Sequence, residues 1–350
     1  MEGKKIRIAI NGFGRIGRAF YKVAKEHPSL EVVAVNDLGD IETMSYLLKY
    51  DTAYGRSGYS IDVEKGEDGG ESALIVDGHR VVVVSVKDPV QLPWRTMNID
   101  IVVESTGLFT TYEKAKAHLD AGATKVVISA PVKGNQVEGI TGATVLMGIN
   151  EEVLANCQIS SNASCTTNAS SPVISILNNT IGIEKAILNT THSYTASQRI
   201  VDLPSGKDLR EGRAAAMNMI PASTGAAIAV GEVITDLKGK FDGISVRVPV
   251  ITGSLADVTF ISKRPTTVEE VNEILVQASK EEKWKGIFTT TNEPIVSSDI
   301  VGDPHASIVD LAMTRVVDGN LVKVLAWYDN EMGYTHSLVR HVLRTAESIV

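Results

Sequence analysis

Residues Asn11–Arg18 read Asn-Gly-Phe-Gly-Arg-Ile-Gly-Arg, and this stretch decides the fold. It follows a short β-branched run, Lys5–Ile10, and precedes a segment whose apolar residues have helical spacing. Gly12, Gly14 and Gly17 have the G-x-G-x-x-G spacing, which permits a tight turn, close approach of a pyrophosphate, and close packing of helix on strand. The helix N-terminus then offers N–H groups to the phosphates. The stretch therefore predicts a βαβ unit that binds a dinucleotide.

A second strand pattern, Leu30–Val35, leads to Asp37, which follows Gly17 by 20 residues. A carboxylate at this place can accept hydrogen bonds from the two hydroxyls of the adenosine ribose. It would repel a 2′-phosphate, so Asp37 favours NAD over NADP as the cofactor. The alternative is a glycine-rich turn at the edge of some other α/β sheet.

Strand and helix patterns alternate through the rest of the first half. Strand patterns cover residues 75–76, 80–86, 99–103 and 125–129, and a helix pattern covers residues 111–121. This alternation predicts a Rossmann-type, doubly wound and mainly parallel sheet. Polar residues follow two of these strands, at Glu104–Gly107 and Ser129–Pro131, where such sheets bind ligands.

The pattern changes after residue 164. Strand patterns at residues 186–191, 243–250, 255–262 and 321–328 have fewer helices between them, which predicts an α+β domain with a mainly antiparallel sheet. We therefore expect an NAD-binding domain at 1–164, completed by a C-terminal helix at 331–350, and a catalytic domain at 165–330. The irregular stretch 194–217 is long enough to be functional, at a subunit contact or over a cofactor.

Composition and charge exclude several classes of protein. The 350 residues are 43% hydrophobic and 22% charged, which indicates neither disorder nor a membrane bundle. Two cysteines cannot form a disulfide framework or a four-thiolate zinc site, and we expect no metal. The net charge of −8 argues against nucleic acid as the main partner. Because no apolar run reaches the ~18 residues of a membrane span, we expect a cytoplasmic enzyme with no membrane partner.

One of the two cysteines has unusual neighbours. Ser161–Asn168 reads Ser-Asn-Ala-Ser-Cys-Thr-Thr-Asn, in which small polar side chains surround Cys165. A cysteine that only packs is typically placed among aliphatic residues, so this run favours a reactive thiol over a half-buried structural one.

His192 is the histidine that best suits a base, because it ends a strand pattern among the small polar residues of Thr190–Thr195. A thiolate–imidazolium pair with Cys165 is the expected result, and a merely hydrogen-bonded histidine is the alternative.

Together these motifs resemble the phosphorylating glyceraldehyde-3-phosphate dehydrogenase family over nearly the whole chain. The segments that carry the resemblance are Asn11–Arg18, Ser161–Asn168, His192–Thr195, Asp208–Arg210 with Arg213, Pro221–Ala227, Arg247–Pro249 and Trp327–Glu331. The resemblance implies oxidation of D-glyceraldehyde 3-phosphate to 1,3-bisphosphoglycerate with NAD and inorganic phosphate, in glycolysis and gluconeogenesis, by a homotetramer. Cys165 would form a thiohemiacetal and then a thioester, and His192 would act as base and oxyanion donor.

The resemblance also assigns binding residues. For the substrate's own phosphate it implies Thr195 and Arg247. For the attacking phosphate it implies Ser164, Thr166, Arg210, Thr224 and Gly225. For the cofactor it implies Gly12, Gly14, Arg15, Ile16, Asp37, Lys87, Ser129 and Asn330, with Asn330 orienting the nicotinamide amide.

Two features depart from a simple expectation. Residues 250–257 read Val-Ile-Thr-Gly-Ser-Leu-Ala-Asp, where many family members have Thr-Pro-Asn-Val-Ser-Val-Val-Asp. Pro172 would start a helix capped by Ser171 if read from local pattern alone, whereas the family begins this helix at Cys165 and carries the proline inside.

Two rival functions can be weighed. An erythrose-4-phosphate dehydrogenase-like enzyme would pass its thioester to water, but Arg210, Ser223–Gly225 and His192–Thr195 keep the phosphorylating pattern. A non-catalytic dinucleotide sensor would be marked by loss of Cys165 or His192, and both are present.

Overall fold

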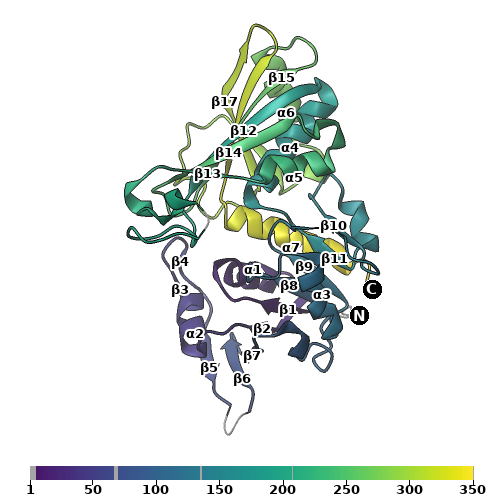
Figure 1. The fold of residues 1–350 in the computed structure, drawn as a ribbon, viewed down its shortest axis with the longest axis vertical. Helices are drawn as coiled ribbons and strands as arrows, with labels where there is room; N and C mark the ends of the chain where they lie inside the picture. The colour runs from purple at the N-terminus through teal and green to yellow at the C-terminus, as the bar shows by residue number, and fades with distance from the viewer. Residues whose placement is uncertain (1–4, 67–69, 135, 207, 350) are drawn as a thin grey trace. The chain divides into compact units, whose positions relative to one another are not determined.

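The computed structural model describes residues 5–66, 70–134, 136–206 and 208–349. Within this part the chain forms two compact units (Figure 1). The first contains the described residues up to Val145, Glu151–Ala163 and those from Leu338 onward. The second contains Leu146–Asn150 and Ser164–Ser337.

These units differ in detail from the division expected from the sequence. Residues 146–150, Ser164 and 331–337 group with the second unit rather than the first. Residue 207 of the expected loop and residue 350 of the expected C-terminal helix lie outside the described residues. The last helix, α7 (Met332–Ala346), therefore begins in one unit and ends in the other.

The first unit is built on a nine-stranded sheet with the order β10-β11-β9-β8-β1-β2-β7-β6-β5. The strands are β1 (Ile6–Asn11), β2 (Leu30–Asn36), β5 (Ile61–Glu64), β6 (Ser72–Val76), β7 (His79–Val84), β8 (Ile101–Glu104), β9 (Lys125–Ile128), β10 (Gly142–Thr144) and β11 (Ile159–Ser161). The pairs from β10 to β7 are parallel, and β5, β6 and β7 pair antiparallel. The doubly wound, mainly parallel sheet is confirmed.

The centre of this sheet explains its strand patterns. Every residue of β8 and β9 is buried, as is all of β1 except Arg7, because helices cover both faces of a parallel sheet. The helices of this unit are α1 (Arg15–Lys25), α2 (Ile41–Lys49) and α3 (Tyr112–Asp120). Sequence reasoning did not place α2, β5, β10, β11 or the small hairpin of β3 (Tyr50–Asp51) and β4 (Gly55–Arg56). These elements are too short or too weakly patterned to stand out.

The second unit has a seven-stranded sheet with the order β13-β14-β12-β15-β18-β17-β16. Its strands are β12 (Ile183–Ser193), β13 (Ile220–Ser223), β14 (Phe241–Val248), β15 (Ser254–Ser262), β16 (Phe288–Thr291), β17 (Ser307–Val317) and β18 (Leu321–Tyr328). Only β12–β14 and β16–β17 pair in parallel, so the mainly antiparallel prediction is confirmed. Sequence reasoning missed β13, β16 and β17.

Three helices pack on one face of this sheet, α4 (Cys165–Thr180), α5 (Ala226–Val233) and α6 (Val268–Ala278) (Figure 1). Burial alternates strictly along β15, which is the pattern of a sheet with one covered face. Short 3-10 helices occur at Pro89–Gln91, Glu151–Asn156, Leu209–Gly212, Ala215–Met217, Thr235–Leu237 and Glu282–Trp284.

Helix α4 settles the position of Pro172. The helix begins at Cys165, and the Oγ of Ser164 caps it by accepting from the N–H of Thr167 at 3.1 Å. Pro172 lies inside the helix, so the local reading with Ser171 as cap is wrong. All residues from Thr166 to Leu177 are buried, and this packing outweighs the hydrogen bond that the proline cannot donate.

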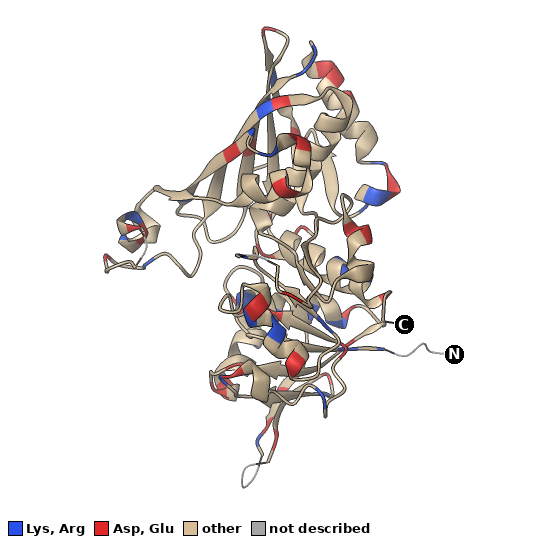
Figure 2. Ribbon diagram, turned by 45° about the vertical axis from the view of Figure 1, so that its right-hand side comes forward, with Lys and Arg blue, Asp and Glu red and all other residues tan. Residues whose placement is uncertain are grey.

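Charged residues of both signs occur in both units (Figure 2). No helix in the described ranges is long and apolar enough to cross a membrane.

Candidate active site

The thiol and the imidazole predicted from sequence meet in the second unit. Cys165 is the first residue of α4, and its Sγ lies 3.3 Å from Nε2 of His192 near the end of β12. Cys165 is partly buried and His192 is only 3% exposed. The residues are 27 positions apart in sequence, so it is packing of the helix on the sheet that brings them together.

The other ring nitrogen of His192 has two competing neighbours. Nδ1 lies 2.7 Å from the carbonyl oxygen of Ser193 and 2.6 Å from Nη1 of Arg247, which pairs with His192 across β12 and β14. A carbonyl needs a proton on Nδ1, whereas a guanidinium N–H needs a lone pair there. With the proton on Nδ1, Nε2 presents its lone pair to the thiol and can act as a base.

Burial shifts both partners toward their neutral forms. It raises the pKa of the Cys165 thiol, while the positive charge of Arg247 and hydrogen bonds from Thr166 work in the opposite direction. Burial, and then Arg247, lower the pKa of His192 to about 3. Desolvation therefore opposes the thiolate–imidazolium pair expected from sequence, and attraction across 3.3 Å favours it.

Tyr328 supports this pair, and sequence reasoning gave it no role. Its hydroxyl lies 2.9 Å from Oγ1 of Thr166 and 2.7 Å from Oγ1 of Thr190. Its ring meets the His192 imidazole edge-on, with centroids 5.9 Å apart. Tyr328 thus links the start of α4 to the strand that carries the histidine. The nearby Asn330 in the same motif was the only signal for it.

Two buried donors lie at the residues assigned to the substrate's phosphate, one on Arg247 itself and one on Gln198, a neighbour of Thr195. Thr195 donates from its backbone N–H to Oε1 of Gln198 at 2.8 Å. Nε2 of Gln198 and Nε of Arg247 are buried and make no hydrogen bond within the described part of the chain. Unsatisfied buried donors are costly, so an anion is a suitable partner for them. Gln198 was not predicted.

Of the residues assigned to the attacking phosphate, only some lie beside Cys165. Ser164 and Thr166 flank Cys165 at the start of α4. Thr224 follows β13 and accepts from the N–H of Ala226 at 3.2 Å, and Gly225 is the N-cap of α5. Arg210 is exposed and forms an ion pair with Asp208 at 2.7 Å. Within the described residues, no hydrogen bond joins Arg210, Thr224 or Gly225 to the thiol or the imidazole.

The dinucleotide turn lies in the first unit with the geometry that its glycines require. Gly12 has φ +94°, and a Cβ there would approach Thr106 N to 2.7 Å. A Cβ on Gly17 would lie 2.1 Å from the carbonyl oxygen of Gly12. A Cβ on Gly14 would meet no atom within 4 Å, so this side of the turn is open. The turn therefore leaves room for a pyrophosphate at Gly14.

Helix α1 begins at Arg15 directly behind this turn. Its N-cap is Gly14 and no side chain caps it, so the helix start at Arg15 and Ile16 suits a phosphate. Asp37 is held beside the turn, because its Oδ2 accepts from Phe13 N at 2.7 Å and its Oδ1 accepts from Gly39 N at 2.9 Å.

Two further cofactor candidates follow strand ends of the same sheet. Ser129 comes directly after β9 and donates from its N–H to the carbonyl oxygen of Glu104 at 2.9 Å. Lys87 is exposed in the loop after β7. Both are at the carboxyl ends of parallel strands, where this type of sheet binds ligands.

A buried carboxylate lies under the turn. Glu104 accepts from Asn11 Nδ2 at 2.6 Å, from Thr106 N at 2.8 Å and from the Thr106 hydroxyl, and it lies 3.1 Å from Nε2 of His118. This network fixes the ends of β1 and β8 beneath Gly12. Sequence reasoning had noted Glu104 only as part of a polar strand end.

The first unit therefore fits NAD on three observations: an uncapped helix start, an open glycine and a fixed carboxylate. No group of three or more His, Cys, Asp or Glu residues that could hold a metal ion occurs in the described ranges.

Asn330 lies in the second unit and is 6% exposed. Its Oδ1 accepts from Ser193 Oγ at 2.8 Å, from Ser254 Oγ at 2.9 Å and from Gly253 N at 3.1 Å. Gly253 and Ser254 belong to the unusual segment 250–257.

Comparisons with known proteins agree with this geometry. Residues 6–112 match the family model for the NAD binding domain of glyceraldehyde 3-phosphate dehydrogenase, and residues 164–330 match the model for its C-terminal domain. A glyceraldehyde-3-phosphate dehydrogenase of Mycobacterium avium is 46% identical, with 98% of this chain and 99% of that protein covered. One of Zymomonas mobilis is 45% identical over the same shares, and one of Geobacillus stearothermophilus is 46% identical over 95% and 96%. The chain belongs to the glyceraldehyde-3-phosphate dehydrogenase family.

Proposed function

We propose that this chain oxidises D-glyceraldehyde 3-phosphate and transfers the acyl group to inorganic phosphate, giving 1,3-bisphosphoglycerate in glycolysis and gluconeogenesis. As a family member the chain is an NAD-dependent oxidoreductase. The observation that carries the proposal is the 3.3 Å contact between Cys165 Sγ and His192 Nε2 at the start of a helix. A thiol with an adjacent base is the arrangement that forms and releases acyl groups.

The chain's own residues account for the covalent steps. Cys165 Sγ attacks the aldehyde carbon while His192 accepts the thiol proton, and the backbone N–H of Cys165 stabilises the oxyanion of the thiohemiacetal. The protonated His192 returns this proton to the oxyanion, which gives the neutral thiohemiacetal, and it then accepts the hydroxyl proton as the hydride leaves. When bound, NAD accepts the hydride from this carbon, which leaves a thioester on Cys165. Phosphate attacks the thioester, and the thiolate leaves.

Two anion sites complete the reaction. Arg247, Thr195 and the amide nitrogen Nε2 of Gln198 bind the substrate's phosphate, which draws the Arg247 guanidinium away from His192 and leaves Nδ1 bonded to Ser193 O. Nε2 then keeps its lone pair toward the thiol. Ser164, Thr166, Arg210, Thr224 and Gly225 bind the attacking phosphate.

The decisive experiment follows NADH at 340 nm from glyceraldehyde 3-phosphate and NAD, with and without inorganic phosphate. We expect phosphate-dependent turnover that vanishes in Cys165→Ser. Cys157→Ser is the matched control, because Cys157 is also a free cysteine but lies in the first unit. Sustained turnover without phosphate would favour a hydrolysing enzyme of the erythrose-4-phosphate type. An active Cys165→Ser variant would refute the proposed nucleophile.

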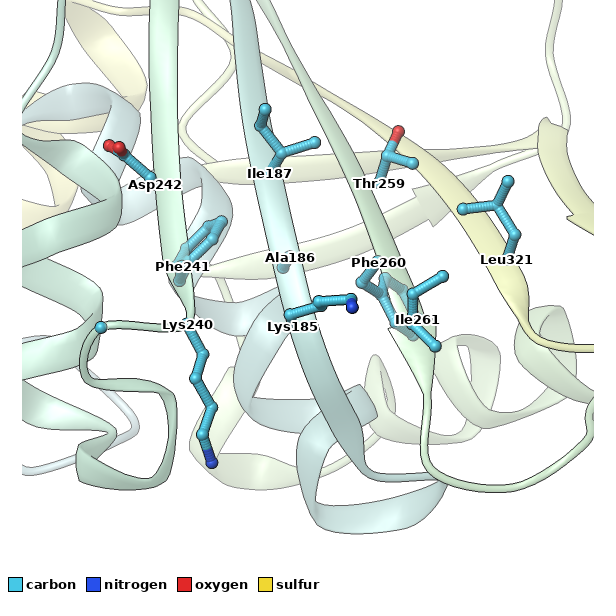
Figure 3. A pocket seen from close by; sticks show the side chains of 11 residues that line it. Lys185, Ala186, Ile187, Lys240, Phe241, Asp242, Thr259, Phe260, Ile261 and Leu321 are labelled. Carbon is cyan, nitrogen blue, oxygen red and sulfur yellow. The ribbon is translucent and has the colours of Figure 1, made fainter.

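We further propose a homotetramer whose contacts include the helix-free face of the second unit's sheet. A pocket of about 440 Å³ lies on this sheet. Ile187, Ile261 and Leu321 are among the residues that line it (Figure 3). Ile187 is 58% exposed and Leu321 is 38% exposed, so this face presents apolar surface. A second copy of the chain can cover it in an isologous contact.

The assembly is tested by sedimentation velocity. We expect Ile187→Asp to dissociate the tetramer, because a charge would be buried in the contact. Val296→Asp is the control, since Val296 is 57% exposed and lies outside the sheet. A monomeric wild-type chain would refute the assembly.

We place the enzyme in the cytoplasm, since both of its cysteines are free, as is usual in a reducing compartment. Cell fractionation tests this placement. We also propose that residues 1–164 with 331–350 bind the cofactor, and that residues 165–330 carry catalysis and the tetramer contacts.

A further inference from the structure

Side-chain hydrogen bonds join the carboxyl ends of neighbouring parallel strands in the first unit. The strands β8, β1, β2 and β7 are adjacent in that order, and Glu104, Asn11 and Asn36 end the first three of them. Asn36 Nδ2 donates to Asn11 Oδ1 at 2.7 Å, and Asn11 Nδ2 donates to Glu104 Oε2 at 2.6 Å. These three residues are at most 6% exposed. We call Asn36, Asn11 and Glu104 the strand-end relay.

A backbone donor after β7 fixes the direction of these bonds. Val86 N donates to Asn36 Oδ1 at 2.9 Å, and a backbone N–H can only donate, so this atom must be the carbonyl oxygen of Asn36. The NH₂ of Asn36 therefore faces Asn11, and it also donates to Val86 O at 3.0 Å. Asn11 must then present its carbonyl oxygen to Asn36 and its NH₂ to Glu104.

An indole fixes the direction from the other side. Trp94 and His118 are fully buried, and Trp94 Nε1, which can only donate, lies 3.2 Å from His118 Nδ1. His118 Nε2 lies 3.1 Å from Glu104 Oε2 and 3.4 Å from Asn11 Nδ2. An imidazole cannot accept at both nitrogens, so Nε2 carries the proton and donates to Glu104. Two donors of fixed direction thus converge on Oε2 of Glu104.

The other carboxylate oxygen of Glu104 reaches the dinucleotide turn. Oε1 accepts from Thr106 N at 2.8 Å and from the Thr106 hydroxyl. A Cβ on Gly12 would lie 2.7 Å from Thr106 N, so the backbone of Thr106 lies directly against the turn. A shift of Glu104 would therefore move the wall of the turn.

We propose that the strand-end relay holds the two sides of the NAD site in register, with Glu104 as the positioning residue. Asp37 directly follows Asn36, and Lys87 directly follows Val86, so the relay connects these two cofactor candidates to the glycine turn. The relay residues are buried and act through the strand ends. The relay concerns only how the first unit holds NAD, so it goes beyond the proposed reaction of the thiol.

Glu104→Gln separates the relay from simple electrostatics. The variant places an NH₂ group among donors, so buried N–H groups lose their acceptor and the strand ends should move apart. Loss of a negative charge near an anionic pyrophosphate would by itself tighten NAD binding. The relay predicts the opposite, a dissociation constant of NAD about tenfold higher by calorimetry without substrate. In turnover, KM for NAD should rise while kcat at saturating NAD changes less than about threefold.

A second substitution tests the direction of the bonds. Asn36→Asp has no donor for Asn11, so the Asn11 amide should turn over and present its carbonyl oxygen to the glutamine of Glu104→Gln. The double variant Asn36→Asp/Glu104→Gln should bind NAD about 3- to 10-fold more tightly than Glu104→Gln alone. It should not reach wild-type affinity, because His118 still donates toward an NH₂ group. Electrostatics alone predicts weaker binding by the double variant, which regains a negative charge.

Ser160→Ala is the matched control. Ser160 lies on β11 of the same sheet, is 2% exposed, and its Oγ lies 2.7 Å from Nε2 of His341. The control should leave the dissociation constant of NAD unchanged even if it lowers stability. Unchanged or tighter NAD binding by Glu104→Gln would overturn the relay, and so would a folded double variant that binds NAD more weakly than Glu104→Gln.

The wild-type protein offers a measurement that needs no folded variant. Nitrogen NMR of histidine-labelled protein should show His118 as a neutral ring with its proton on Nε2. The ring is identified by the nuclear Overhauser effect from the Trp94 indole proton. A proton on Nδ1 would reverse the bond to Trp94 and overturn the relay.

Discussion

The dinucleotide turn and the thiol site are built in opposite ways. The turn uses backbone groups and one carboxylate from the short span Asn11–Asp37, and its shape depends on where side chains are missing. The thiol site uses side chains of Cys165, His192 and Arg247, which come from a helix and two strands. The turn should therefore be sensitive to added atoms, and the thiol site to changed functional groups.

The largest effect on activity is expected at the thiol site. His192→Gln removes the base, so kcat should fall about 10²–10⁴-fold. Binding of NAD, measured by calorimetry, should stay within about twofold because the turn does not use this residue. A variant with nearly wild-type kcat would show that Cys165 is activated without His192.

Added atoms should disrupt the dinucleotide turn and weaken NAD binding. Gly17→Ala would place a methyl group 2.1 Å from Gly12 O, so we expect a loss of about 1–3 kcal/mol in the free energy of unfolding and NAD binding at least about tenfold weaker. Gly14→Ala meets no atom within 4 Å and should keep its stability within about 0.5 kcal/mol.

Gly14→Ala should nevertheless weaken NAD binding about tenfold, because the methyl group occupies the space for the pyrophosphate. Calorimetric melting and NAD titration measure both properties. Unchanged affinity in Gly14→Ala would mean that the pyrophosphate does not approach this glycine.

Asp37 tests the one side chain on which the turn depends. Asp37→Asn keeps the shape but removes the charge, so the preference for NAD over NADP should fall about tenfold. The ratio of the two dissociation constants measures it. Asp40→Asn serves as control, because Asp40 is exposed and caps α2. A preference that survives in Asp37→Asn would place the 2′-phosphate discrimination elsewhere.

The smallest effect on activity is expected at the second of the two buried histidines, His341. Burial lowers the pKa of His341 from 6.5 to about 3. For His192, burial and the charge of Arg247 together lower the pKa to about 3. As the pH falls, each histidine is protonated in the unfolded chain before it is protonated in the folded chain. The stability that each neutral histidine contributes is therefore fully present above about pH 6.5 and is lost as the pH falls toward 3. Each contributes a slope of up to about 1.4 kcal/mol per pH unit.

His341→Gln should remove its own share of this slope in urea unfolding between pH 4 and 7, while kcat at pH 7 changes little. His341 bonds Asn162 and Ser160 in the first unit and does not contact the thiol. An unchanged slope would mean that His341 is already protonated in the folded chain.

Sequence reasoning reached the main elements where local patterns are strong. The alternating strands and helices predicted the parallel sheet, and the glycine spacing predicted the turn with Asp37 beside it. It failed for β16 and β17, and it left the start of α4 open, because a proline inside a helix contradicts local propensity. It also missed Tyr328 and Gln198, whose partners are set by contacts between strands and loops.

The sequence by itself determined the dinucleotide turn, because glycine spacing and strand order act over a few residues and need no distant partner. It also marked Cys165 and His192 by their polar neighbours. Only the tertiary structure decided the 3.3 Å contact between them, the position of Arg247 against Nδ1, and the orientation of Asn330. These depend on burial and on pairing between elements far apart in the chain, which no local pattern encodes.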